Sequence, residues 1–108
     1  MPPMKTLWIK DEYLRWILQG RKTIEVRVAY SNIARLLVGD HVMLNDQHPF
    51  VIQRIGRYAN FAELLANENP QAIAPDLSSE QLLAALRKIY PPAKESLGVI
   101  ALEIAAEP

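Results

Sequence analysis

The stretch of sequence that decides the fold is Gly20-Arg21-Lys22-Thr23-Ile24-Glu25-Val26-Arg27. Apolar and polar residues alternate from Thr23 onward, which predicts a strand with its apolar face in a core. The opposite face then carries Thr23, Glu25 and Arg27. Lys22 lies just before the strand, so the backbone would hold a cation, a carboxylate and a guanidinium close together. This pattern predicts a polar site built on a rigid element.

The residues before this stretch predict a short strand at 7–9 and a helix over 11–19. Leu14, Ile17 and Leu18 form an apolar stripe with helical spacing. Gly20 suits the left-handed residue at which many helices end. The charged stretch therefore begins at the C-terminus of a helix.

The remainder of the chain predicts further strands and helices in turn-connected runs. The strands are expected at 23–30, 41–44, 50–58 and 97–104. Helical segments are expected at 31–37 with Leu37 facing inward, from the Asn60 cap to 67, and from the Ser78 capping box to Pro91, with a loop over 69–77. Gly56 inside the long strand predicts a bulge or a close backbone approach. This order favours antiparallel pairing and an α+β barrel of five or six strands.

Size and composition limit the function classes. The 108 residues fit one domain, residues 1–108, with one core. Twelve basic and twelve acidic side chains balance, which argues against polyanion binding by bulk charge but leaves room for a local basic patch. With no cysteine and two separate histidines, we expect no metal and no cofactor. No apolar run suits a membrane span and the first residues do not resemble a signal peptide, so we expect a cytoplasmic protein without a membrane partner.

The charged stretch resembles a known family signature. Gly20, Lys22, Glu25 and Arg27 fit the G-x-K-x-x-E-x-R motif of the ASCH domain, named for activating signal cointegrator homology. Four further segments are similar to the family in the right order: residues 37–42, 61–65, 89–91 and 98–100. The chain is identified as a member of the small, single-domain bacterial type. The resemblance implies a PUA-like mixed or antiparallel β-barrel with flanking helices, and a cleft beside the motif that binds RNA or a nucleotide.

The motif residues have both functional and structural interpretations. Lys22 either contacts a phosphate or base, acts as a nucleophile or base once desolvated, or simply stabilises a helix C-terminus. Glu25 either accepts from a base amino group while Arg27 binds phosphate, or the two form an ion pair in the barrel wall.

Three more residues complete the predicted ligand-binding set. Thr23 is a minor hydroxyl donor or a plain strand residue, and Arg54 and Arg57 either bind RNA or belong to the barrel exterior. Trp8 and Trp16 are expected in the core or the cleft wall. Trp16 lies off the apolar stripe, so it is also a candidate stacking platform.

Two other function classes remain open. Some small family members are hydrolases that deacetylate acetylated cytidine or cut RNA. The amidohydrolases use a lysine, a threonine and a glutamate: Lys22 falls on the lysine, Glu25 stands where they have threonine, and Glu68 is the nearest match to the glutamate, with Glu63 second. An ionised Glu25 cannot donate as a hydroxyl does. From the correspondence of positions, the hydrolase hypothesis names Lys22, Glu25 and Glu68 as a metal-independent catalytic set. A protein-interaction module would instead show an exposed apolar patch.

Overall fold

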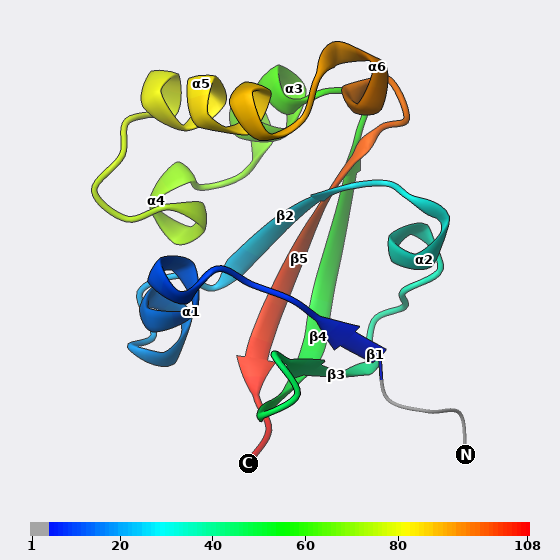
Figure 1. Ribbon diagram of the computed structural model, residues 1–108, viewed down its shortest axis with the longest axis vertical. Helices are drawn as coiled ribbons and strands as arrows, with labels where there is room; N and C mark the ends of the chain where they lie inside the picture. Colours follow the sequence, from blue (N-terminus) through cyan, green and yellow to red (C-terminus); the bar gives the residue numbers. More distant parts are fainter. Residues whose placement is uncertain (1–4) are drawn as a thin grey trace.

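The computed structural model describes residues 5–108; residues 1–4, used above only in the argument against a signal peptide, lie outside this range. Within it, five strands form one curled sheet, a half-barrel (Figure 1). The strands are β1 (Lys5–Leu7), β2 (Ile24–Val28), β3 (His41–Leu44), β4 (His48–Tyr58) and β5 (Val99–Ala106), in the spatial order β1-β3-β4-β5-β2. β1 pairs with β3 in parallel and the other pairs are antiparallel. The expected α+β class with a mixed, barrel-like sheet is confirmed.

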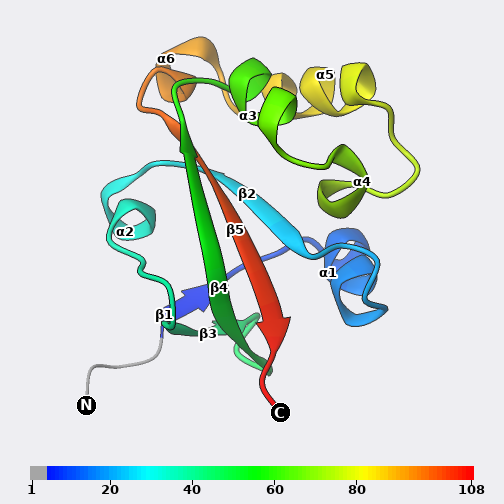
Figure 2. The same ribbon diagram turned by 180° about the vertical axis from the view of Figure 1, so that it is seen from behind.

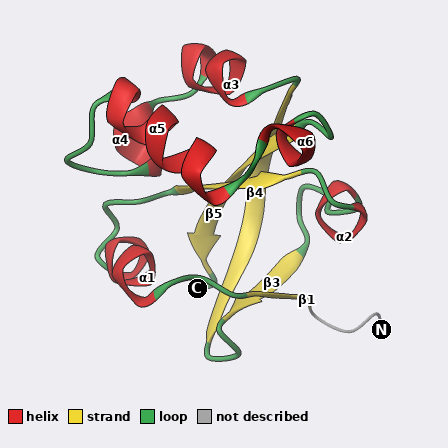
Figure 3. Ribbon diagram, turned by 45° about the horizontal axis from the view of Figure 1, so that its top comes forward, coloured by secondary structure: helices red, strands yellow, loops and turns green. Residues whose placement is uncertain are grey.

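Six helices of the described range flank this sheet. They are α1 (Asp11–Leu18), α2 (Ser31–Ala34), α3 (Phe61–Asn67), α4 (Pro70–Ile73), α5 (Ser79–Ile89) and α6 (Pro92–Glu95). Helices α3, α5 and α6 gather at one end of the sheet, α1 and α2 lie on either side of it, and α4 lies between α5 and α1 (Figures 1 and 2). Seen with its top tilted forward, the molecule shows α1 facing α4 and α5 across the start of β2 (Figure 3).

The sheet separates two apolar clusters. Strand β5 contributes to both, because alternate residues of a strand point to opposite faces. Ile100 and Leu102 pack in the cluster beneath β1, β3, α1 and α2, whereas Val99 and Ala101 pack in the cluster beneath α3, α4 and α5. All four are almost fully buried. The central strands are thus fixed on both faces, and β2 at the sheet edge is held against β5.

Several predicted elements are confirmed. The predicted helix at 11–19 is α1, and Gly20 after it has φ +78°, the left-handed conformation expected at a helix end. Helix α5 begins with the predicted capping box, in which the Ser78 side chain accepts from the backbone of Gln81 and the Gln81 side chain accepts from the backbone of Ser78.

Other predictions were wrong for identifiable reasons. The segment 69–77 contains α4, and α6 follows α5 directly, because Pro70 and Pro92 begin helices instead of only ending them. Proline suits the first helical turn, where its missing N–H is not needed. Leu37 is 64% exposed and does not face inward. The first strand ends at Leu7 and leaves Trp8 outside the core.

Of the two predictions for Gly56, a bulge or a close approach, the structure confirms only the close approach. The register shift in β4 falls between Ile52 and Arg54, so the bulge is not at Gly56. The close approach is confirmed: a Cβ atom on Gly56 would lie 2.5 Å from Oε2 of Glu68. Only a residue without a side chain leaves room there for the carboxylate.

Candidate functional site

Lys22 is held in place by three acceptors. After α1 ends, the chain turns at Gly20 and brings Lys22 to the start of β2, where it is 5% exposed. Its Nζ donates to the carbonyl oxygens of Ile24 at 2.7 Å and Ile73 at 2.8 Å, and lies 3.2 Å from Oε1 of Glu25. A lysine ammonium has three N–H donors. Each of them has a partner, so Lys22 ties β2 to α4 and fixes one oxygen of Glu25.

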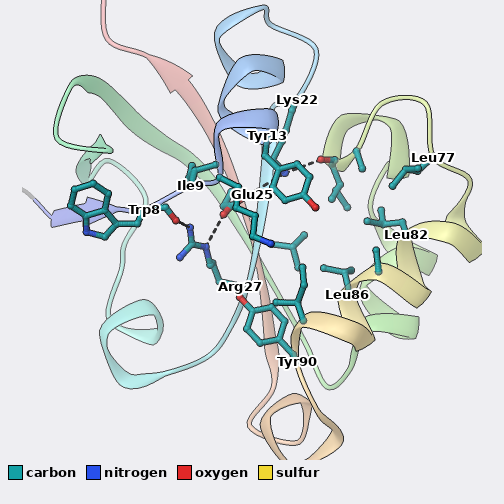
Figure 4. Close-up of a pocket in the computed structure, with 16 residues that line it drawn as sticks. Trp8, Ile9, Tyr13, Lys22, Glu25, Arg27, Leu77, Leu82, Leu86 and Tyr90 are labelled. Atoms are coloured by element: carbon teal, nitrogen blue, oxygen red, sulfur yellow. Dashed lines mark hydrogen bonds and ion pairs between the residues drawn. The ribbon is translucent and has the colours of Figure 1, made fainter.

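Glu25 and Arg27 continue this chain of contacts. The second oxygen of Glu25 accepts from Nε of Arg27 at 2.7 Å, and Nη2 of Arg27 donates to the carbonyl oxygen of Trp8 at 2.7 Å (Figure 4). Trp8 directly follows β1, and β1 and β2 are the two outer strands of the sheet. The Arg27 side chain therefore bridges the open seam of the half-barrel.

These three charged residues line one side of a cleft of about 200 Å³. Trp8, Ile9 and Tyr13 line it next to them. The opposite wall is apolar and comes mainly from α5 and the segment before it; Figure 4 shows Leu77, Leu82, Leu86 and Tyr90 facing the charged side. The cleft thus offers a flat ligand an apolar surface together with a hydrogen-bonding edge.

Burial changes the acid–base properties of the cleft. Desolvation lowers the pKa of Lys22, because burial disfavours a charged ammonium, while the nearby Glu25 carboxylate acts in the opposite direction. Burial raises the pKa of Tyr13 and of Tyr90, so both phenols keep their protons at neutral pH. The cleft therefore also presents two neutral hydroxyl groups.

A second cluster surrounds Glu68, which is 7% exposed. Arg54 contacts both of its carboxylate oxygens, with Nη1 at 3.0 Å from Oε2, and the hydroxyl of Tyr58 donates to Glu68. Nε of Arg54 also donates to Glu103 at 3.2 Å. The hydrogen bonds from Arg54 lower the pKa of Glu68, and the bond to Glu68 raises the pKa of Tyr58. None of these residues lines the cleft that holds Lys22.

The structure thus brings together Lys22, Glu25 and Arg27 but not the other predicted site residues. Thr23 precedes β2, is exposed and lines a different, broader hollow. Arg57 is exposed and donates to the carbonyl oxygen of Ala34 at 3.2 Å, away from the cleft. The positions of Arg54 and Glu68 in the second cluster separate them from Lys22.

Sequence reasoning missed one wall of the cleft. Leu82 and Leu86 recur at helical spacing, which is typical of core residues, and they are indeed buried. Their stripe gave no signal that space remains between α5 and β2. Trp8, expected in the core or the cleft wall, lines the cleft, and so does Tyr90, which carried no prediction as a site residue.

Other kinds of site find little support among the described residues. No group of three or more histidine, cysteine, aspartate or glutamate residues in 5–108 is arranged to hold a metal ion. In the same range, no helix has the length and apolar character needed to cross a membrane.

A small α+β half-barrel with a charged cleft beside its outer strand defines the structural class. The sequence profile of the ASCH domain matches residues 7–106, so the chain belongs to the ASCH domain family, within the PUA-like superfamily. The family resemblance seen in the sequence is confirmed. No curated protein sequence matches the chain.

Two solved structures share this fold. The crystal structure of hypothetical protein PH0355 aligns with a TM-score of 0.91 and 25% identity, covering 97% of this chain and 100% of the other. The solution structure of protein PF0455 from Pyrococcus furiosus aligns with a TM-score of 0.80 and 25% identity, covering 96% and 97%. The half-barrel and its flanking helices are therefore a shared architecture along the whole length.

Proposed function

We propose that this protein binds RNA and that its cleft takes one unpaired nucleobase. The observation that carries this proposal is the pairing of Glu25 and Arg27 on one side of the cleft with an apolar wall on the other. A nucleobase is flat and apolar on its faces but has donors and acceptors along its edge, and unpaired bases are what proteins read in RNA. The cleft offers a complementary surface to both parts.

Glu25 and Arg27 have unused hydrogen-bonding positions, which supports a role in recognising the edge of a base. A guanidinium has five N–H donors, and the contacts of Arg27 with Glu25 and Trp8 occupy two of them, which leaves three. A carboxylate has about four lone-pair sites, and Lys22 and Arg27 occupy two of those of Glu25. Glu25 therefore accepts from a base amino group while Arg27 donates to a base or phosphate oxygen.

Lys22 has a different role in this proposal from the one its sequence motif suggested. Its three donors are already used by Ile24, Ile73 and Glu25. It acts as a positioning residue that holds the Glu25 carboxylate towards the cleft. The ligand contacts then fall to Glu25 and Arg27.

The hydrolase hypothesis has one observation in its favour, the lowered pKa of Lys22. An amine with a lowered pKa is a better base or nucleophile at neutral pH. However, a catalytic carboxylate must reach the reacting atoms. Glu68 is bound by Arg54 and Tyr58 and does not line the cleft, which leaves Glu25 as the only carboxylate of the predicted set beside Lys22. Recognition is therefore the better-supported function.

Binding and turnover measurements on the same variants test the proposal. Calorimetric titration with the four nucleoside monophosphates and short unpaired RNA should show binding to the native protein. Glu25→Gln should weaken it by about 5- to 150-fold, the range for losing a base-reading contact of about 1–3 kcal/mol. Arg57→Lys is a matched control for Arg27→Lys, since Arg57 lies away from the cleft.

Glu25→Gln also removes the counterion of buried Lys22. Arg27→Lys is therefore measured as a second, independent variant. Lysine keeps the charge but cannot bridge Glu25 and Trp8 with one planar group. Thermal unfolding of each variant shows whether a loss of binding is merely a loss of folding. If neither RNA nor nucleotides bind the folded native protein, the proposal is wrong. If acetylated cytidine or RNA is converted and Glu25→Gln stops it, the hydrolase hypothesis replaces it.

A further inference from the structure

Trp8 is the most exposed large apolar side chain of the described residues, at 65%. Its neighbours Leu7 and Ile9 are 4% and 7% exposed, so the extended backbone places the indole outward between two anchored residues. The backbone N–H of Ile9 donates to Oδ1 of Asn45 at 2.7 Å, and Nδ2 of Asn45 donates back to the carbonyl oxygen of Ile9 at 2.8 Å. The ring is exposed, but its backbone is firmly held.

The position of this ring relates it directly to the cleft. Nη2 of Arg27 donates to the carbonyl oxygen of Trp8, and both residues line the cleft. Figure 4 shows the indole on the far side of Arg27 from the apolar wall of Leu82 and Leu86. Lys10, an exposed cation two residues further along the chain, lines the same cleft. An aromatic ring and a cation thus both border the cleft.

We propose that Trp8 stacks on the nucleobase adjacent to the one held in the cleft, so that the ligand is a single strand of at least two nucleotides. This inference rests on the proposed function and specifies its ligand. The first base is read by Glu25 and Arg27, the second lies on the indole, and the phosphate between them faces Lys10 and the free N–H groups of Arg27. A free nucleoside would fill only the first of these positions.

Physical reasons favour a strand over a free nucleoside. The chain has no net charge, so charge attraction contributes little to its affinity. Stacking on an aromatic ring adds affinity for any neighbouring base, since every base has a flat π-face. Selectivity would then come from the cleft, and Trp8 would add affinity without sequence preference.

The test measures what a second nucleotide adds to binding. Dissociation constants are compared for nucleoside monophosphates, dinucleotides and tetranucleotides of RNA, with native protein and with Trp8→Ala. Native protein should bind the dinucleotide about 5- to 150-fold more tightly than the better of its two mononucleotides, as expected for one stacked base. Trp8→Ala should lose most of this gain. Leu37→Ala is the matched control, because Leu37 is 64% exposed but does not line the cleft.

Fluorescence gives an independent readout. Trp16→Phe leaves Trp8 as the single tryptophan, and Trp16 does not line the cleft. Dinucleotide binding should quench Trp8 emission strongly, and mononucleotide binding should quench it much less. The inference is overturned if dinucleotides bind no more tightly than mononucleotides, or if Trp8→Ala preserves the gain. In either case the proposed function stands as long as mononucleotides bind; if no nucleotide or RNA binds, both fail together.

Discussion

Two buried carboxylates in this protein have similar exposure but different surroundings. Glu25 and Glu68 are 8% and 7% exposed, and each is paired with an arginine. One oxygen of Glu25 contacts the buried Lys22 and the other contacts Arg27, and Glu25 lines a cleft. Glu68 instead accepts hydrogen bonds from two nitrogen atoms of Arg54 and from the hydroxyl of Tyr58. Burial and ion pairing therefore do not distinguish the carboxylate proposed to bind a ligand from the one outside the cleft.

Space and unused hydrogen-bonding capacity do distinguish them. The carboxylate of Glu68 is packed against Gly56 and Tyr58, and Arg54 contacts both of its oxygens. Glu25 faces a cleft with an apolar opposite wall. This contrast agrees with the recognition role proposed above for Glu25, whereas Glu68 connects the end of α3 to β4.

The largest expected effect comes from removing the lysine that only the Glu25 cluster contains. Lys22→Met removes the donor to one oxygen of Glu25 and to two backbone carbonyls, and breaking a buried ion pair typically costs about 3–5 kcal/mol. The free energy of unfolding is measured by urea denaturation. Lys10→Met, at an exposed lysine, should change it by no more than about 0.5 kcal/mol. Equal stability of the two variants would contradict the structural role of Lys22.

The Glu68 cluster is best disturbed through its glycine. Gly56→Ala places a Cβ 2.5 Å from Oε2 of Glu68 and 2.9 Å from the Tyr58 ring, and such overpacking costs about 1–3 kcal/mol. Nucleotide affinity should not change, since neither residue lines the cleft. In a Glu68→Ala background the cost should shrink, because one of the colliding groups is absent. Additive costs in this double-mutant cycle would show that the carboxylate does not cause the strain.

Lowering the pH should remove the stability that the carboxyl of Glu68 contributes to its cluster. Its pKa is lowered in the folded state, chiefly by the hydrogen bonds from Arg54. A carboxyl with a lowered pKa contributes stability above its unfolded pKa, about 4.5, and this contribution is lost as the pH falls through its folded pKa. Glu68→Gln should therefore be less stable at neutral pH and should lose less stability on acidification. Unfolding curves of the native protein and of Glu68→Gln between pH 3 and 7 check this.

The smallest expected effect is the salt dependence of RNA binding. A single strand releases counterions with a slope of about −0.7 per phosphate contact, so one contact gives about a threefold loss between 50 and 200 mM salt. Arg27→Gln should reduce this slope. Arg54→Gln should leave it unchanged, because Arg54 is neutralised by Glu68 outside the cleft. A steep native slope would instead indicate that RNA runs over a much wider basic surface.

The sequence predicted the elements that carry local signals. The helix ending at Gly20, the capping box at Ser78 and the face shared by Glu25 and Arg27 all follow from residue type and spacing. The prediction failed where one residue type has two uses: a loop was expected over 69–77 and a helix end at Pro91, but Pro70 and Pro92 begin helices. Local patterns do not distinguish these uses, because the surrounding backbone decides between them.

The site was predictable only in part. The motif placed Lys22, Glu25 and Arg27 together, since all three depend on one turn and one strand. It could not show that the donors of Lys22 are occupied, because Ile73 lies 51 residues away in the chain. The partnership of Arg54 with Glu68 and the cleft wall from α5 likewise depend on tertiary packing. Spacing identifies residues on one element but not the space left between two elements.

The contact between Lys22 and Ile24 has a consequence for the outer edge of the sheet. Ile24 begins β2, an edge strand, and its carbonyl oxygen accepts from the ammonium of Lys22 instead of from a further strand. The backbone N–H of Thr23 is similarly occupied by the carbonyl oxygen of Ala72. Unpaired edges invite other chains to add strands, and proteins protect them by covering or charging them. One carbonyl oxygen at this edge is therefore already occupied by the buried Lys22 and is not free to pair with an added strand.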